Sequence, residues 1–491
     1  MEGMSKPHIA LVNPPHSLEE RYGAMKAAGN TMPSIGLLGM AAILRKEGFS
    51  VTVVDAPARG ISYSQTLKEA LAGNPQAVGM TAFTPSVFNA AKMAHLLKEA
   101  VPGLPIALGG PHCAAIPEES VKMFDCFDAI AIGEGEPVIA PLMETLAGRG
   151  DLSHIPGLYF SSGGEVKKTG PAVQVKDMDS LPFPAWDLAP GFPHSYRPAA
   201  HTHRRLPSAT MFTTRGCPEQ CRFCDRSVFG NSIRGFSAEY VVNQMETLSR
   251  DWGVRDLIIY DDIFPLLKPR LLKICELIHT RGLNLTWSCN SRVNFAEPDA
   301  LAAMRGAGCW QIGYGIESGD QGILDIIGKR IKLEQVERAV RLTEEAGIRT
   351  KGFFIIGHPG ETLATIRATI DFAKQLRLSD YQTCFFTPFP GTDIHRDADK
   401  YGTVVATWDK MNLLAPAFLP TGLVSDDLER WAARSYREFY LRPRIVWRYL
   451  SGIRSPYHVL QIIRGGLALL SSLVRAAFHR MIHRKPESSQ H

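Results

Sequence analysis

The chain has 491 residues, enough for two to four domains by the usual relation between length and domain number. Its composition, 45% hydrophobic and 21% charged, is ordinary for a soluble globular protein, and the net charge of +5 says little about partners. No stretch reaches the roughly 18 consecutive apolar residues of a membrane-spanning helix, which argues against an integral membrane protein.

The first residues and the cysteines indicate in which cellular compartment the protein is found. Residues 1–7 contain no apolar region, so we expect no signal peptide. Nine cysteines are an odd number, and six of them lie scattered in mostly apolar contexts, where buried free thiols are expected. This usage predicts a cytoplasmic protein rather than a secreted disulfide framework. The six scattered cysteines are Cys113, Cys126, Cys275, Cys289, Cys309 and Cys384.

The first 150 residues alternate short apolar segments with helical ones. Strands are expected at residues 8–13, 49–55, 77–81, 106–110 and 129–132. Helices are expected between them at residues 36–47, 63–71 and 86–100. This alternation predicts an α/β fold in which residues 1–150 form a doubly wound, Rossmann-like parallel sheet.

Ligands of such sheets bind in the crevice beyond the carboxyl ends of the strands. Glycine pairs at these ends let the backbone approach a ligand closely, although glycine after a strand is more often only part of a turn. The residues at these ends are therefore candidates for binding. They are Thr81, Thr84, Gly109, Gly110, Pro111, His112, Gly133, Glu134, Gly135 and Glu136.

Residues 151–205 are rich in proline and glycine and are expected to be a linker. A small hairpin is predicted, with strands within residues 152–160 and 173–175 and Gly163-Gly164 between them. The two prolines of Leu181-Pro-Phe-Pro-Ala-Trp186 forbid a helix there. We interpret Trp186 as packing surface, with a substrate contact as the alternative.

Residues 206–400 repeat a strand–helix unit six times. Strands are expected at residues 209–214, 257–260, 285–290, 310–317, 350–357 and 382–386, each pair separated by a helical segment. Six such units predict a partial (β/α)6 barrel, whose sites line the carboxyl ends of its strands.

Three thiols follow the first of these strands. Cys217, Cys221 and Cys224 are spaced C-x3-C-x2-C, whereas zinc sites usually offer four protein ligands. Three thiolates on one loop suit a [4Fe–4S] cluster with one iron left without a protein ligand. The alternatives are a zinc knuckle completed by His201 or His203, or a disulfide with a spare thiol.

This cysteine triad resembles the signature of the radical S-adenosylmethionine (SAM) enzymes, and Phe223 matches the aromatic that the family places against the SAM adenine. The resemblance implies that the open iron chelates SAM. It also implies that an electron from a donor such as flavodoxin or ferredoxin cleaves SAM to methionine and a 5′-deoxyadenosyl radical. The triad would then be both the metal site and the source of catalysis.

The resemblance extends to the other strand ends of the barrel. Asp261 and Asp262 resemble an acidic position near the SAM amino group, with a helix cap or a solvated pair as the alternative. Arg292 would hold a carboxylate such as that of methionine. Residues implied for the ribose, the SAM amine and the adenine are Glu317, Ser318, Gly357 and Pro388, whereas Glu361 is expected only to start a helix.

The upstream domain resembles the cobalamin-binding domain of B12-dependent radical SAM enzymes. The resemblance is carried by Asn13-Pro-Pro, Gly109-Gly-Pro-His112 and Gly133-Glu-Gly-Glu136. The Asp-x-His-x-x-Gly motif that supplies a cobalt ligand in other B12 domains is absent, which leaves the lower cobalt ligand open. We interpret His112 as a turn residue that lines the cofactor tail rather than as a cobalt ligand.

Residues 401–491 are expected to form a helical extension with a helix at residues 425–440, which resembles a substrate-covering tail. From Arg442 to Lys485 there are nine Arg or Lys and no Asp or Glu, with apolar residues between them. A basic amphipathic segment of this kind predicts peripheral association with the inner face of the membrane. The alternatives are a helix packed on the barrel and, less in keeping with the apolar residues, nucleic acid, which we do not expect.

Together these features predict a B12-dependent radical SAM enzyme. The leading hypothesis is methylation of an unactivated carbon in a small hydrophobic substrate such as a lipid, isoprenoid or tetrapyrrole. Oxidative cyclisation, as in the anaerobic magnesium-protoporphyrin monomethyl ester cyclase, and ring rearrangement share this architecture. A non-enzymatic B12 or iron–sulfur sensor is disfavoured because Arg292, Glu317 and the glycine-rich loops are present.

Overall fold

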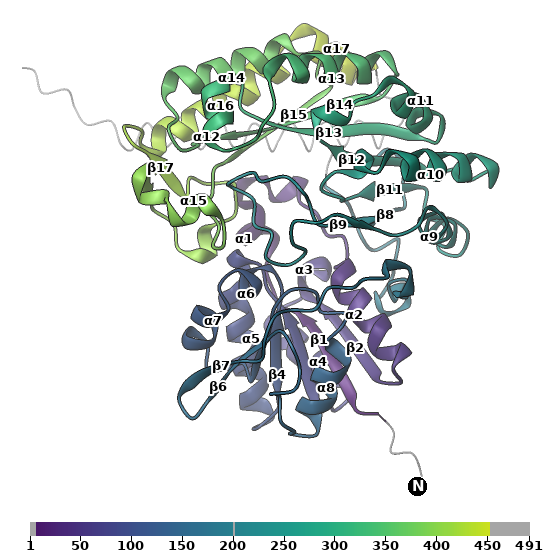
Figure 1. The fold of residues 1–491 in the computed structure, drawn as a ribbon, viewed down its shortest axis with the longest axis vertical. Helices are drawn as coiled ribbons and strands as arrows, with labels where there is room; N and C mark the ends of the chain where they lie inside the picture. Colours follow the sequence, from purple (N-terminus) through teal and green to yellow (C-terminus); the bar gives the residue numbers. More distant parts are fainter. Residues whose placement is uncertain (1–5, 200–201, 452–491) are drawn as a thin grey trace, which may run out of the picture.

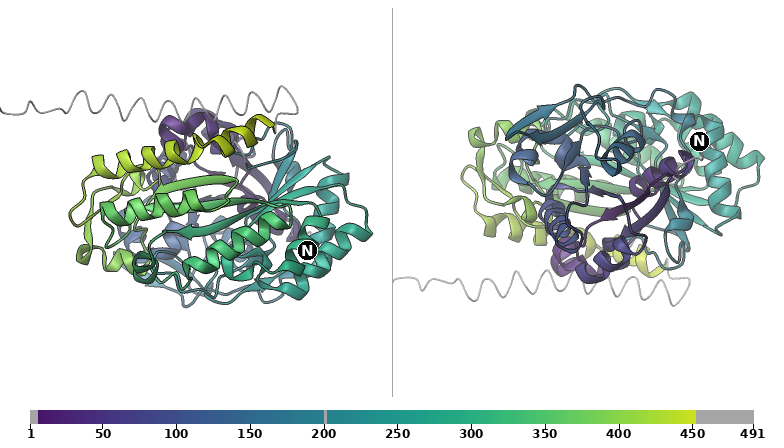
Figure 2. Two further views of the ribbon diagram at one scale, coloured as in Figure 1. Left: turned by 90° about the horizontal axis from the view of Figure 1, so that it is seen from above. Right: turned by 90° about the horizontal axis from the view of Figure 1, so that it is seen from below.

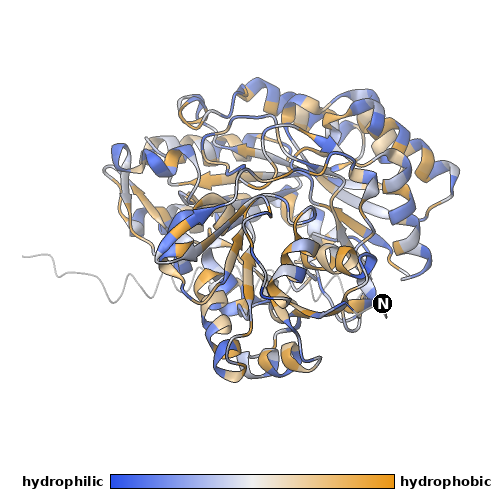
Figure 3. Cartoon of the chain, turned by 60° about the horizontal axis from the view of Figure 1, so that its bottom comes forward, coloured by the Kyte–Doolittle hydropathy of each residue, from blue (hydrophilic) through white to orange (hydrophobic). Residues whose placement is uncertain are grey.

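A computed structural model describes residues 6–199 and 202–451 of the chain. Figure 1 shows two α/β domains stacked on one another, with the N-terminal sheet below and the second sheet above. In Figure 3 the strands of the lower sheet are mainly hydrophobic, whereas its helices alternate hydrophobic and hydrophilic residues. The carboxyl ends of the strands of the lower domain face the upper domain, which places the predicted binding residues at the junction.

The N-terminal sheet has seven strands in the order β2-β1-β3-β4-β5-β6-β7. The first five pair in parallel, as predicted, and the last two pair antiparallel. The strands are β1 His8–Asn13, β2 Ser50–Asp55, β3 Ala77–Thr81, β4 Ile106–Gly109, β5 Ala129–Ala131, β6 Leu158–Ser162 and β7 Glu165–Lys168. The helices are α1 Leu18–Tyr22, α2 Ile35–Lys46, α3 Ala56–Arg59, α4 Tyr63–Leu71, α5 Val87–Ala100, α6 Pro111–Ala115, α7 Pro117–Met123 and α8 Ile139–Ala147.

The hairpin β6–β7 extends this sheet, and the prediction of its second strand at residues 173–175 was wrong. Gly163 and Gly164 both have positive φ, at 62° and 82°. Two such residues form the tight turn that joins adjacent strands, so Ser162 pairs at once with Glu165. The second strand therefore begins directly after the glycine pair.

The second sheet has six parallel strands in the order β15-β14-β13-β12-β11-β8, as predicted for a partial barrel. The strands are β8 Ser208–Met211, β11 Asp256–Ile259, β12 Thr286–Ser291, β13 Cys309–Glu317, β14 Arg349–Ile356 and β15 Asp380–Phe385. The helices are α9 Ala238–Arg250, α10 Lys268–Thr280, α11 Pro298–Gly306, α12 Gln321–Ile326, α13 Leu333–Glu345 and α14 Leu363–Gln375.

Shorter elements complete the upper domain. The antiparallel pair β9 Thr214–Arg215 and β10 Arg234–Gly235 brackets the cysteine loop. A second small pair, β16 Gly402–Val404 and β17 Phe418–Pro420, follows the short helix α15 Asp393–Arg396. The chain then forms the helices α16 Ser425–Tyr440, as predicted, and α17 Pro443–Ser451.

Helix α16 covers the edge strand β15, as the view from above in Figure 2 shows. The Tyr436 hydroxyl accepts from the Thr383 amide at 3.2 Å and donates to its carbonyl at 2.9 Å. The Tyr440 hydroxyl does the same at Tyr381, at 3.2 Å and 2.8 Å. These two hydroxyls pair backbone groups that an edge strand otherwise exposes.

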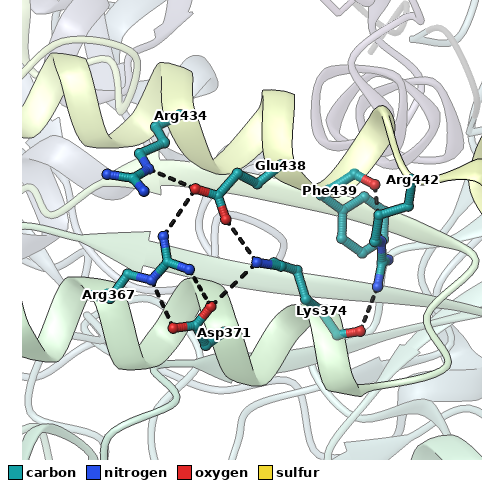
Figure 4. Close-up of polar contacts among 7 residues, drawn as sticks. All are labelled: Arg367, Asp371, Lys374, Arg434, Glu438, Phe439 and Arg442. Atoms are coloured by element: carbon teal, nitrogen blue, oxygen red, sulfur yellow. Dashed lines mark hydrogen bonds and ion pairs between the residues drawn. The ribbon is translucent and has the colours of Figure 1, made fainter.

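Ion pairs fasten α16 to α14 beside this edge (Figure 4). Glu438 lies 2.9 Å from Arg367, 2.8 Å from Lys374 and 2.6 Å from Arg434. The three cations hold the pKa of the Glu438 carboxyl at about 2, because their hydrogen bonds and charges outweigh its burial. The carboxylate therefore stays charged throughout the physiological pH range.

The predicted membrane-binding segment lies mostly outside the described residues. In its described part, Ile445 of α17 is buried, and Arg444 and Arg448 contact Glu344 of α13 at 2.5 Å and 3.3 Å. Helix α17 thus packs on the barrel, which was one of the alternatives. Within residues 6–199 and 202–451, no helix has the length and apolar character needed to span a membrane.

Candidate active site between the two domains

The cysteine loop leaves the barrel directly after β9. Gly216 has φ +80°, and a Cβ at this position would lie 2.2 Å from the Ser232 carbonyl oxygen, so the return of the loop requires glycine. The Cys224 amide donates to the Cys221 carbonyl at 3.2 Å, which turns the last two cysteines onto one side. All nine cysteines lie in the described residues and none forms a disulfide, contrary to that alternative.

The residues around the thiols fit an iron–sulfur cluster. Cys217 and Cys224 each lie close enough to Cys221 for its charge to disfavour their ionisation. Burial also raises the pKa of Cys217, so its thiolate forms readily only where a metal takes the place of the proton. Three thiols on one loop, two of them beside Cys221, are the donor set that a cluster requires.

Arg292 follows β12 and lies against this loop. Its Nη1 donates to the Cys221 sulfur at 3.3 Å and contacts Glu219 at 3.1 Å, while Nη2 donates to the Lys329 carbonyl. Its side chain is buried. The predicted contact with the SAM carboxylate stays a prediction, because both terminal nitrogens are engaged by the protein itself.

Glu317 ends β13 on an irregularity in the sheet, with φ +68°. Its carboxylate accepts from Lys329 Nζ at 2.6 Å, and both side chains are more than nine-tenths buried. The Lys329 ammonium also lies 5.8 Å from the centre of the Phe223 ring. Lys329 was missed by the sequence reasoning; its signal was a lysine in Gly328-Lys-Arg330 directly after a helix.

The remaining predicted residues, which follow β11 and β13, differ in burial and in their hydrogen-bond partners. Asp261 is buried and accepts from the Thr213 amide and hydroxyl, each at 2.5 Å, and burial raises its pKa. These bonds end β8 at Met211, three residues earlier than predicted. Asp262 is exposed and close enough to raise the pKa of Cys217. Ser318 contacts the Thr369 hydroxyl at 3.1 Å and so points toward α14.

The loop after β14 is closed by Glu361. Its carboxyl accepts from the Gly357 amide and from the His358 amide at 3.0 Å, and burial raises its pKa to about 8. The expectation that Glu361 starts the helix was wrong, since Thr362 caps α14. The neighbouring His358, which was also missed, is buried between Phe223 and Phe386. Burial lowers its pKa to about 3, so it is neutral.

The last barrel strand leads to Pro388. Its carbonyl lies 2.9 Å from His395 Nδ1, which anchors the loop that follows β15. Gly391 in this loop has φ +87°, and a Cβ there would lie 2.9 Å from both the Ala115 Cβ and Asp225 Oδ1. The loop therefore touches the N-terminal domain and the cysteine loop together.

Opposite the barrel, the strand ends of the N-terminal domain present glycine turns and one histidine. Gly110 has φ +104°, and a Cβ there would lie 2.7 Å from the Ala82 oxygen and 2.8 Å from Thr81 Oγ1. His112 is buried, with Nδ1 3.2 Å from Thr84 Oγ1 and its ring 4.5 Å from that of Trp408. Burial lowers the pKa of His112 to about 4.

His112 supports a ligand site at these strand ends. Its Nε2 is buried and makes no hydrogen bond to any residue that the structure describes. A buried polar atom without a partner suits a site that a bound group completes. Together with the glycine turns, this fits the polar side chains of a corrin ring.

The Gly133-Glu-Gly-Glu136 segment connects the two domains. Glu134 pairs with Arg234 and lies 3.4 Å from Arg215, and Glu136 also pairs with Arg215. Gly133 has φ +72°, and a Cβ there would lie 2.5 Å from the Ala172 Cβ. The two glutamates thus fix the N-terminal domain to the base of the cysteine loop, while their predicted contact with cofactor stays a prediction.

A cavity of about 400 Å³ lies at this junction. Its wall comes from the strand ends of the N-terminal domain, from the residue after Cys224, from the loop after β15 and from the segment that follows Trp408. The volume is within the range of small-molecule sites. The lining residues are Phe83, Thr84, Pro85, Pro111, Asp225, Phe389, Pro390, Met411, Asn412 and Leu413.

Comparisons with known proteins match both domains. Residues 211–373 match the family model of the radical SAM superfamily, and residues 23–142 match that of the B12 binding domain. An uncharacterized methyltransferase of Pyrococcus horikoshii is 32% identical over 89% of this chain and 93% of its own length. An anaerobic magnesium-protoporphyrin IX monomethyl ester cyclase of Rubrivivax gelatinosus is 28% identical, with 85% of this chain and 75% of the relative covered.

Solved structures share the fold. The cobalamin-dependent SAM radical enzyme OxsB, solved with aqua-cobalamin and SAM, matches with a TM-score of 0.72 and 17% identity over 97% of this chain and 75% of that chain. The radical SAM methyltransferase TsrM of Kitasatospora setae matches with 0.68 and 19% identity over 96% of this chain and all of its own. With the cysteine loop on one domain and the B12 fold on the other, the chain belongs to the cobalamin-dependent radical SAM enzymes.

Proposed function

We propose that this enzyme is a methyltransferase that acts on an unactivated carbon of an apolar substrate held in the cavity between the domains. The observation that carries the proposal is the position of that cavity. It is bounded on one side by Asp225, next to Cys224, and on the other by Thr84, which contacts His112. Because Thr84 and Pro111 of this wall belong to the loops that would hold the corrin, a substrate there would lie between the radical source and that cofactor.

The chemistry comes from the groups that the two domains would hold. When bound, a [4Fe–4S] cluster with SAM supplies a radical that removes a hydrogen atom, and cobalamin supplies a methyl group. Cys217, Cys221 and Cys224 would hold the cluster. The loops at Thr81–Thr84, Gly109–His112 and Gly133–Glu136 would hold the corrin.

The protein's own residues organise that chemistry. The Glu317–Lys329 pair places one buried ammonium beside Phe223, where the amino-acid or adenosine part of SAM would lie. Glu361 fixes the loop at Gly357 and His358 by accepting hydrogen bonds from both backbone amides. Phe389 and Pro390, just before Gly391, and the segment at Met411–Leu413 form the mostly apolar part of the cavity wall on the barrel side.

The lining supports an apolar substrate. Seven of the ten residues that line the cavity are apolar, and two of them are phenylalanines and three are prolines. Such a surface binds ring systems or hydrocarbon chains through burial of apolar area. A lipid, isoprenoid or tetrapyrrole fragment has this character, although the cavity would admit only part of a large one.

An electron donor of the flavodoxin or ferredoxin class would complete the cycle. Binding to the inner face of a membrane through residues 442–485 is a separate proposal, supported by the basic residues of that segment other than Arg444 and Arg448, which pair with Glu344. Sedimentation with vesicles containing anionic lipid, compared with a chain truncated after Tyr440, tests it. Equal sedimentation of both proteins would contradict it.

The methyl-transfer proposal is tested by anaerobic reconstitution with iron, sulfide, cobalamin and SAM, followed by addition of candidate substrates. Methyl transfer predicts 5′-deoxyadenosine and S-adenosylhomocysteine in equal amounts, because one SAM gives the radical and a second restores the methyl donor. The similarity to a cyclase gives the competing prediction, in which the substrate is cyclised and no methyl group is transferred. Substrate turnover with 5′-deoxyadenosine and without S-adenosylhomocysteine would establish cyclisation or rearrangement instead.

A further inference from the structure

The cavity wall carries charge of one sign only. Its three polar residues are Thr84, Asp225 and Asn412, and the wall contains no lysine or arginine. Asp225 is therefore the one charged residue of the ten that line the cavity. Its place beside Cys224 puts a carboxylate at the end of the cavity nearest to the radical source.

The other two polar side chains are already engaged. The Thr84 hydroxyl contacts His112 Nδ1 at 3.2 Å. The Asn412 side chain accepts from the Leu414 amide at 3.1 Å through Oδ1 and donates to the Glu20 carbonyl at 3.4 Å through Nδ2. Neither group is well placed to recognise a new ligand strongly.

The Asp225 carboxylate keeps acceptor capacity. Oδ1 accepts from the Ser227 amide at 3.1 Å and Oδ2 from the Ser227 hydroxyl at 2.7 Å. A carboxylate can accept about four hydrogen bonds. Within residues 6–199 and 202–451, no lysine or arginine forms an ion pair with Asp225, in contrast to Glu134 and Glu317.

The physical consequence concerns whatever fills the cavity. An occupant that covers Asp225 removes water from a charged group, which is costly unless the occupant supplies a cation or hydrogen-bond donors. An anionic group in the same place would be repelled by the Asp225 carboxylate. The wall thus favours one sign of ligand charge.

Building on the function proposed above, we propose that the substrate is an apolar molecule bearing an amine or another nitrogen cation, and that Asp225 binds that group. Phosphorylated or carboxylated substrates are excluded from this end of the cavity by the same carboxylate. The apolar wall would hold the rest of the molecule.

The test uses two fluorescent probes that share a dansyl ring and a similar chain. Dansylcadaverine ends in an ammonium, and dansyl-6-aminohexanoic acid ends in a carboxylate. Fluorescence titration of the anaerobically reconstituted enzyme, with cluster and cobalamin but without SAM, is expected to show at least tenfold tighter binding of the cationic probe. Because no turnover is involved, this result does not depend on which reaction the enzyme performs.

Variants separate charge from loop structure. Asp225→Asn keeps an oxygen that can accept from the Ser227 amide but lacks the charge, and it is expected to bring the two affinities within about threefold of each other. Asn412→Lys adds a cation to the wall at a site distant in sequence from the cysteines and is expected to reverse the preference. Asp393→Asn, which changes a carboxylate paired with Arg396 outside the cavity wall, is the matched control and should keep the preference.

Iron and sulfide content and the visible absorption of each variant show that the cluster is intact. Equal affinity of the wild-type enzyme for the two probes would overturn the proposal. So would an unchanged preference in Asp225→Asn with a full cluster. Loss of all probe binding when cobalamin is loaded would also overturn it, because the cavity would then belong to the cofactor.

Discussion

At the strand ends of the barrel, charged side chains are held in pairs: Glu317 by Lys329, and Arg292 by Glu219 and the Cys221 sulfur. At the strand ends of the N-terminal domain, glycine turns predominate, and the buried polar atom there, His112 Nε2, has no partner among the described residues. On the barrel side, ion pairs and hydrogen bonds therefore hold the charged groups in place before a ligand binds. On the N-terminal side, backbone turns that require glycine form the surface that a ligand would contact. Substitutions should therefore lower stability on the barrel side and cofactor affinity on the N-terminal side.

The largest effect is expected at the buried pair of the barrel. Lys329→Met leaves the Glu317 carboxylate buried without its counter-charge, which should lower the free energy of unfolding by about 3–5 kcal/mol. Denaturant unfolding of the full chain measures this. The double variant Lys329→Met/Glu317→Gln should recover part of the loss, and a single variant as stable as wild type would show that the pair is not desolvated.

On the N-terminal side, Gly110→Ala should act through shape. Its Cβ would overlap the Ala82 oxygen and Thr81 Oγ1 at an unfavourable φ, so we expect about a tenfold loss of cobalamin affinity. Absorption titration with cobalamin measures it. Gly170→Ala is the matched control, because Gly170 has φ +112° but open space around it. Equal losses of cobalamin affinity in both variants would contradict a specific role of Gly110, because general backbone strain would then explain them.

A smaller effect is expected from Arg292→Lys. A hydrogen bond from Arg292 to the Cys221 sulfur favours the reduced, more negative cluster, so its loss should lower the reduction potential. A bond worth about 1 kcal/mol corresponds to a shift on the order of 40 mV for one electron. Potentiometric titration followed by electron paramagnetic resonance measures it, with Arg270→Lys, which contacts backbone carbonyls, as control. An unchanged potential would contradict this role.

The smallest effect concerns pH. Burial raises the pKa of Glu361 from 4.5 to about 8, so the folded protein favours the protonated carboxyl. The stabilisation from this group is complete below pH 4.5 and is lost as the pH rises through about 8. Between pH 6 and 7 the unfolding free energy should fall by about 1 kcal/mol more in wild type than in Glu361→Gln. Parallel pH dependences of the two proteins would refute the raised pKa.

The strands and helices of both domains were predictable because their apolar periodicity is strong and local. The predicted bounds of the helix at residues 425–440 and of the strand at 8–13 agree with the structure. The spacing of Cys217, Cys221 and Cys224 identified the radical chemistry, since those three ligands lie within one loop. These features depend on residues close together in the sequence.

Features that depend on distant residues were missed. Lys329 pairs with Glu317, twelve residues away, only because α12 brings the chain back to the end of β13. The engagement of Arg292 by Cys221 joins positions 71 residues apart. Likewise the cavity wall needs Met411–Leu413, which Trp408 positions against His112 and Phe88. No local pattern encodes the contact of Arg292 with Cys221 or the cavity wall at Met411–Leu413.

The central claim is that the cysteine loop is the radical source of a cobalamin enzyme. Its most direct test is SAM cleavage by the reconstituted Cys217→Ala variant beside the wild-type enzyme, under anaerobic conditions with dithionite. We predict that wild type forms 5′-deoxyadenosine and that the variant forms none while it retains cobalamin binding. Formation of 5′-deoxyadenosine by the variant at the wild-type rate would contradict the account.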